Sequence, residues 1–179
     1  MATWAWSTTR RMVLAAGLAL LGACASVPPP AAPADGSRRA AAVLDSLHEA
    51  ASRADGPRYF SLFTPDAVFI GTDVGERWSL AQFRAYAEPF FARGRGWTYV
   101  ARQREVTIQP IPCRCVASFD EVLASEKYGT ARGSGVLRKV GDDWKVAQYV
   151  LSFPVPNALA EQITAQIKVH EAATPQKGP

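Results

Sequence analysis

The chain has 179 residues, of which 20 are basic and 16 acidic, and 48% are hydrophobic. This composition is typical of a folded protein, and the length suits one domain of ordinary size. No arginine-rich helix or basic-aromatic motif accompanies the small positive excess, so we expect no nucleic-acid partner. Two histidines without a ligand-spaced set, and no Gly-rich phosphate loop, predict that the chain holds neither a metal nor a nucleotide cofactor.

The N-terminus has the pattern of an export signal. Arg10 and Arg11 precede an apolar run over residues 12–23, which ends in two small residues directly before Cys24. Twelve apolar residues are too few for a bilayer-spanning helix, which needs roughly 20. Residues 21–24 resemble the lipobox of bacterial lipoproteins, which implies cleavage before Cys24 and a lipid on its thiol. A plain secretory signal with an incidental cysteine is the alternative.

This interpretation divides the chain into four parts. Residues 1–23 are the signal peptide, 24–36 a Pro/Ala-rich tether, 37–172 the folded domain and 173–179 a disordered tail. Without residues 1–23 the net charge falls from +4 to about +2, because both signal arginines are lost. Ala25 follows the cysteine where inner-membrane retention usually shows Asp, so we expect a lipid anchor in the outer membrane, facing the periplasm. The paired arginines leave both the general secretory and the twin-arginine routes open.

The first half of the domain is predicted to be mostly helical. Leu44, Leu47 and Ala51 form an apolar stripe at helical spacing. Ser79 begins a capping box. In chain order we expect a helix from Ser37 to the stop at 55–57, a short helix over 58–63, a strand over 67–71, and a helix from Ser79 that Gly94 closes.

The second half is rich in residues that favour strands. Four strands are predicted over 97–111, 115–127, 130–140 and 143–154, with a hairpin turn at Gly141. Asn157 is positioned to cap a final helix. Helices followed by a meander predict an α+β fold in which N-terminal helices pack on a curved antiparallel sheet.

Several short motifs in this order resemble SnoaL-like members of the nuclear-transport-factor-2-like superfamily. They occur at 60–73, 76–78, 132–137 and 144–149, within a resemblance that covers about 40–157. The resemblance implies a cone-shaped domain with an apolar pocket between sheet and helices, and dimerisation through the outer sheet. The superfamily includes isomerases, cyclases, dehydratases and pocketed proteins without known catalysis, so the fold does not settle the function.

Strict alternation along the last strand predicts two largely apolar faces. One face would hold Gln148 as its inward polar group, and the other would hold Tyr149 and Leu151. An antiparallel sheet with one face in solvent should show polar side chains on that face. Because both faces are instead predicted to be largely apolar, we expect a homodimer to cover the outer one.

Three residues are candidates for proton transfer. Asp120 and Glu121 are adjacent in a strand, so one of them must point inward. A desolvated carboxylate has a raised pKa and can act as a general base. The alternative is a structural bridge to Arg132 or Arg104. His48 lies beside the buried helical stripe, either for proton transfer or as a boundary histidine bonded to a loop.

A second set of residues is expected to meet a ligand. Asp73, Glu76 and Trp78 occupy a loop, where a carboxylate beside an aromatic ring suits a pocket mouth. Helix capping or pairing with Arg77 is the alternative. Phe69 and Phe83 belong with other aromatic residues either to the pocket wall or to the core. The residues we predict to bind ligand are Asp73, Trp78, Tyr86, Phe90, Arg132 and Gln148.

Cys113 and Cys115 remain after the lipid-bearing cysteine. An oxidising compartment favours a disulfide between them. In an extended strand their Cα atoms would be about 6.5–7 Å apart, at the limit for bridging, although Pro110 and Pro112 indicate a bend. Free thiols and intermolecular pairing are the alternatives.

The leading functional hypothesis is a lipid-anchored domain that binds a small apolar or amphipathic molecule without established catalysis. The alternatives are a proton-transfer enzyme that uses Asp120, Glu121 or His48, and a dimeric scaffold. An open apolar pocket would favour binding, a pocket with one buried unpaired carboxylate near a donor would favour the enzyme, and a sealed core would favour the scaffold.

Overall fold

The structure, a computed structural model, describes residues 35–174. The predicted signal peptide, the lipidation site Cys24 and nearly all of the tether lie outside these residues. The elements in chain order are α1 (Asp35–Ser52), α2 (Gly56–Ser61), β1 (Phe63–Ile70), β2 (Arg77–Ser79), α3 (Leu80–Phe91), β3 (Val100–Ile108), β4 (Val116–Ser125), β5 (Gly129–Val140), β6 (Asp143–Ser152), the 3-10 turn η1 (Asn157–Leu159) and α4 (Ala160–Ala173).

The expected α+β order is confirmed, but the sheet is mixed. Its six strands lie in the order β2-β1-β6-β5-β4-β3. Every neighbouring pair is antiparallel except β1 and β6, which run parallel. The meander β3 to β6 follows from local hairpins, whereas β1 joins β6 across most of the domain, a long-range pairing that local patterns do not encode.

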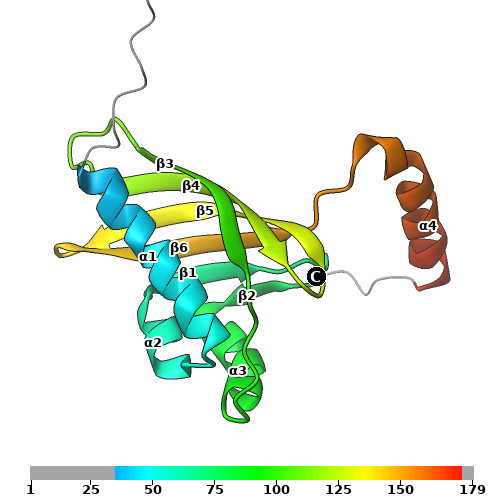
Figure 1. Cartoon of the computed structure of the whole chain (residues 1–179), viewed down its shortest axis with the longest axis horizontal. Helices are drawn as coiled ribbons and strands as arrows, with labels where there is room; N and C mark the ends of the chain where they lie inside the picture. Colours follow the sequence, from blue (N-terminus) through cyan, green and yellow to red (C-terminus); the bar gives the residue numbers. More distant parts are fainter. Residues whose placement is uncertain (1–34, 175–179) are drawn as a thin grey trace, which may run out of the picture. The chain divides into compact units, whose positions relative to one another are not determined.

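Helix α1 lies across one face of the sheet, with α2 and α3 near β1 and β2 (Figure 1). Its predicted stripe is buried, with Leu44, Leu47 and Ala51 each 2% exposed or less. The helix begins at Asp35, two residues earlier than predicted. Because the stripe faces the sheet, the residue beside it, His48, also reaches the layer between helix and strands.

Two short segments place the aromatic residues discussed below. Strand β1 starts at Phe63 and includes Pro65, where the ladder to β6 is irregular and a missing backbone N–H is tolerated. Strand β2, which the sequence did not predict, pairs Trp78 with Phe69. Ser79 then caps α3 through the expected capping box with Gln82.

A β-bulge corrects the predicted faces of the last strand. Val136 pairs with Gln148 while Leu137 pairs with Val146, so Ala147 is unpaired and the alternation changes phase there. Tyr149 is therefore the inward residue, at 4% exposure, and Gln148 lies on the opposite face. The prediction that Gln148 points inward is wrong. The homodimer stays a prediction, but the supposed outward position of Tyr149 no longer supports it.

The C-terminal segment differs in detail from the prediction. Asn157 starts η1 and makes no side-chain cap, because Pro156 and Leu159 occupy the cap positions of η1 and α4. No residue of α4 is buried. Among residues 35–174, no helix combines the length and apolarity needed to cross a bilayer.

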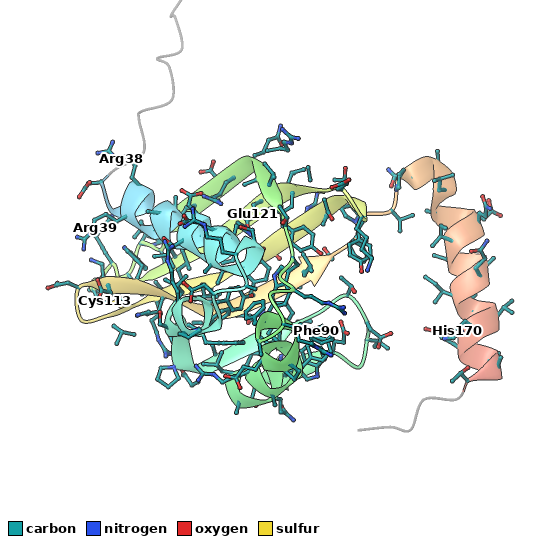
Figure 2. The ribbon with its side chains drawn as sticks, turned by 60° about the horizontal axis from the view of Figure 1, so that its bottom comes forward. Arg38, Arg39, Phe90, Cys113, Glu121 and His170 are labelled. Carbon is teal, nitrogen blue, oxygen red and sulfur yellow. A yellow bond between two sulfur atoms is a disulfide. The ribbon has the colours of Figure 1, made fainter. Side chains whose placement is uncertain are left out.

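Cys113 and Cys115 form a disulfide at the turn between β3 and β4, where Figure 2 labels Cys113. Their Cα atoms are 5.1 Å apart. Arg114 between them has a φ of 44°, so the chain turns instead of extending. This turn brings the two cysteines within bridging distance.

Candidate functional site

The first polar cluster centres on Glu121, which is 1% exposed and lies between the sheet and α1 (Figure 2). His48 Nε2 lies 2.7 Å from its Oε1, and the Tyr149 hydroxyl donates to the same oxygen at 2.8 Å. Arg104 Nε donates to Oε2 at 2.8 Å. Both carboxylate oxygens are thus occupied, and His48 must donate from Nε2 because an ionised carboxylate only accepts.

Arg104 links this cluster to α1. It is the direct neighbour of Glu121 across β3 and β4. Its Nη1 donates to Asp45 Oδ1 at 2.6 Å and to the carbonyl oxygen of Ala41 at 3.2 Å. Of the two partners considered from sequence, Arg104 forms the bridge, whereas Arg132 is exposed.

The environment of Glu121 keeps it ionised. Burial raises its pKa, but the hydrogen bond and charge of His48 and the charge and hydrogen bond of Arg104 outweigh burial, so the pKa lies below 4.5. The raised pKa expected of a desolvated carboxylate is therefore not found. Asp120, its neighbour, is exposed on the other face.

Gly133 makes room for the cluster. A Cβ atom at this position would lie 2.3 Å from the Tyr149 hydroxyl oxygen and 2.8 Å from Glu121 Oε1. Since real Cβ atoms do not approach so closely, a side chain here would displace the hydrogen-bonded pair. The glycine is part of the polar cluster although it contributes no polar side chain.

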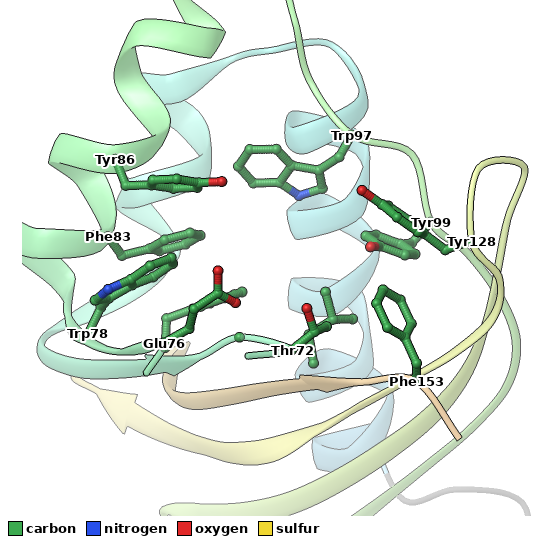
Figure 3. Close-up of a pocket in the computed structure, with 12 residues that line it drawn as sticks. Thr72, Glu76, Trp78, Phe83, Tyr86, Trp97, Tyr99, Tyr128 and Phe153 are labelled. Atoms are coloured by element: carbon green, nitrogen blue, oxygen red, sulfur yellow. The ribbon is translucent and has the colours of Figure 1, made fainter. Parts of the chain in front are cut away.

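The second feature is an aromatic pocket of about 300 Å³, open to solvent on one side. Trp78, Phe83 and Tyr86 form one wall, and the opposite wall faces them across the gap in Figure 3. The opposite wall consists of Trp97, Tyr99, Tyr128 and Phe153. Pockets of this kind bind small organic molecules through apolar contact with a few polar groups that orient them.

A column of stacked rings joins the pocket to the Glu121 cluster. The rings of Tyr149 and Phe69 are parallel with centroids 5.8 Å apart, and Phe69 stacks on Phe83 at 3.9 Å. Trp78 continues the column at 5.9 Å from Phe83, and Tyr86 lies 4.8 Å from Trp78. Because the Tyr149 hydroxyl is hydrogen-bonded to Glu121, Tyr149 holds one end of the ring column in place, and this column continues into a wall of the pocket.

A smaller cavity of about 20 Å³ lies between the two features. His48 and Tyr149 border it, and Phe69, Trp97 and Tyr99 line both this cavity and the aromatic pocket. The space is about enough for one water molecule. The polar cluster therefore touches the aromatic pocket through shared walls, while Glu121 lines neither space.

Glu76 is the charged residue among the side chains that line the pocket, and Figure 3 shows its carboxylate directed into the space between the walls. The loop from Gly71 to Glu76 positions it. Gly71 N donates to the Glu76 carbonyl oxygen at 2.8 Å, and Asp73 N donates to Oε2 at 3.2 Å. A Cβ on Gly71 would lie 2.1 Å from Oε2, so the glycine lets the carboxylate fold inward.

The structure brings together only part of the predicted ligand-binding set. Trp78 and Tyr86 line the pocket. Asp73, Phe90, Arg132 and Gln148 lie outside its lining, although Phe90 packs on Tyr86 at 5.5 Å. Sequence reasoning missed the wall formed by residues 97, 99, 128 and 153. The alternation of Trp97 and Tyr99 was a signal for two of them, but Tyr128 lies in a turn.

Residues 35–174 contain no group of three or more His, Cys, Asp or Glu side chains placed to hold a metal ion. The features that these residues do supply are an aromatic pocket with one carboxylate and a buried ion pair in which Arg104 Nη2 has no hydrogen-bond partner.

The sequence over residues 40–156 matches the family model of the SnoaL-like domain. The chain belongs to the SnoaL-like domain family. No curated protein sequence matches the chain.

Solved structures share the fold of this SnoaL-like domain. An NTF2-like protein of unknown function from Pseudomonas putida superposes with a TM-score of 0.56 at 14% identity, covering 68% of this chain and 88% of that one. A candidate aromatic ring hydroxylase from Novosphingobium aromaticivorans superposes with a TM-score of 0.57 at 19% identity, covering 70% of this chain and 93% of that one. A candidate NTF2-like dehydratase from Streptomyces avermitilis superposes with a TM-score of 0.55 at 14% identity, covering 67% of this chain and 96% of that one. At these identities the likeness establishes the NTF2-like fold alone.

Proposed function

We propose that this SnoaL-like domain binds a small apolar or amphipathic organic molecule in its aromatic pocket. The observation that carries the proposal is the open pocket of about 300 Å³ with aromatic side chains on two facing walls. A flat ligand between the two walls would fill the space that the rings leave open and would bury apolar area on both of its faces.

The state of Glu121 favours binding over proton transfer by this residue. A general base needs a free lone pair within reach of the proton that it removes. Glu121 accepts three hydrogen bonds, has a lowered pKa and does not line the pocket. We infer that it holds Tyr149, and through it the ring column, in place.

Substitutions of two aromatic residues on α3, Tyr86 and Phe90, test the proposal. With N-phenyl-1-naphthylamine, a neutral aromatic probe, we expect saturable binding, and Tyr86→Ala should weaken it about fivefold or more because one wall loses its outer ring. Phe90→Ala is the matched control, since this ring lies one turn along and outside the lining. Fluorescence titration of the purified full-length chain measures both. Equal losses in the two variants, or no saturation in the parent, would refute the pocket as the binding site.

We further propose that the domain is tethered to the envelope through lipid on Cys24. The lipobox-like residues 21–24 support this, and the disulfide between Cys113 and Cys115 suits an oxidising compartment. Cys24→Ser should leave an uncut or soluble protein that incorporates no labelled fatty acid. Label on that variant would exclude acylation at Cys24.

A further inference from the structure

The aromatic pocket contains a negative charge that lacks a cationic partner. Within the part of the chain that the structure describes, Glu76 forms no ion pair, and the hydrogen bond to its carboxylate comes from Asp73 N. The half-buried carboxylate thus has one hydrogen-bond donor but no counter-charge, and a cation beside it would supply that counter-charge. The pocket therefore offers a favourable position for a positively charged group.

The walls around Glu76 also attract cations. The face of an aromatic ring is electron-rich, and a cation within about 6 Å of its centroid is attracted to it. Trp78 and Phe83 lie on one side of the carboxylate and Trp97 on the other (Figure 3). Three or more rings around one carboxylate form an arrangement that suits an ammonium group whose substituents are apolar.

Lys127 shows that rings of this region do contact a cation. Its Nζ lies 4.7 Å from the ring centroid of Tyr128, one of the pocket residues. Lys127 itself lines an adjoining hollow with Trp97, Tyr99 and Tyr128, not the space that holds Glu76. Lys127 therefore does not neutralise Glu76, whose carboxylate is left for a ligand.

We propose that the ligand is an organic cation, an alkyl- or arylalkylammonium compound whose charged group lies against Glu76 between the rings. This inference rests on the proposed binding function and specifies its ligand class. A neutral molecule would leave the carboxylate without a cation, and an anion would be repelled by it. The pocket should therefore bind a cation more tightly than a neutral or anionic ligand of the same shape.

An isosteric pair of probes tests the inference. Benzyltrimethylammonium and neopentylbenzene have nearly the same shape and differ in charge. Calorimetric titration of the purified full-length chain should give a dissociation constant about tenfold or more lower for the cation. Glu76→Gln keeps the acceptor for Asp73 N, and should remove most of this preference while leaving the neutral probe bound as before.

Two controls separate local from general effects. Asp73→Asn removes a carboxylate that belongs to the same loop as Glu76 but does not line the pocket. This substitution should change the dissociation constant of the cation by about twofold or less. Lys127→Met removes a competing positive charge and should leave cation binding as tight or tighter. Weaker cation binding in Lys127→Met would contradict the assignment of the charged group to the Glu76 side.

The outcomes distinguish the two proposals. Equal binding of the two probes, or a cation preference that survives Glu76→Gln, would overturn the inference while the binding function stands. Failure of both probes and of the neutral naphthylamine would overturn the binding function itself. Circular dichroism of Glu76→Gln confirms that a loss is not due to unfolding.

Discussion

Glu121→Leu should lower the free energy of unfolding by about 3–5 kcal/mol, the usual cost of removing one partner of a buried ion pair. Arg104 would keep only the exposed Asp45 as its counter-charge, while His48 and Tyr149 would lose their acceptor. Urea denaturation of the full-length chain measures the change. Asp120→Asn is the matched control on the adjacent, exposed position, and should stay within about 0.5 kcal/mol of the parent.

The same cluster predicts a pH dependence. The pKa of Glu121 is lower in the folded than in the unfolded chain, so its stabilisation is fully present above the unfolded value and is lost as pH falls through the folded one. The relevant window is therefore below about pH 4.5. Glu121→Gln should show a shallower loss of stability in that window than the parent. Parallel curves for the two proteins would contradict the lowered pKa.

Gly133→Ala should also be strongly destabilising. Overpacking costs about 1–3 kcal/mol, and the displaced Tyr149 hydroxyl would leave buried polar groups unpaired at about 1–3 kcal/mol more. The Cβ would meet that hydroxyl at 2.3 Å. Gly75→Ala provides a matched substitution, because its Cβ would make an ordinary contact at 3.4 Å with Asp73 Oδ1. We expect it to change stability by less than about 1 kcal/mol.

A double-mutant cycle identifies the cause of the Gly133→Ala effect. Tyr149→Phe removes the oxygen that the new methyl group would meet, so the two losses should be less than additive by at least about 1 kcal/mol. Strict additivity would show that the glycine is required for a reason other than the Tyr149 hydroxyl.

Local patterns in the sequence predicted local structure well. The stripe of Leu44, Leu47 and Ala51 placed α1, and Ser79 with Gln82 placed the start of α3, because these signals act within one or two turns of the chain. The α+β class followed from the order of elements. The parallel pairing of β1 with β6 did not, since it depends on segments far apart in sequence.

The candidate site was predictable only in part, for two physical reasons. One unpaired residue, Ala147, reversed the faces of the last strand, and alternation alone gives no sign of a bulge. The adjacency of Asp120 and Glu121 did predict one inward carboxylate, but not which one, nor its partners. Trp78 and Tyr86 were identified, while the facing wall comes from three separate segments.

The central claim, that a small molecule binds between the aromatic walls, is tested most directly by the tryptophan indole N–H signals in a two-dimensional NMR titration with N-phenyl-1-naphthylamine. Trp78 and Trp97 line the pocket, whereas Trp144 is buried in the core outside it. Binding in the pocket predicts saturable shifts of the Trp78 and Trp97 signals and an unchanged Trp144 signal. Shifts of Trp144 as large as those of the other two, or no shift of Trp78 and Trp97 at saturating probe, would contradict it.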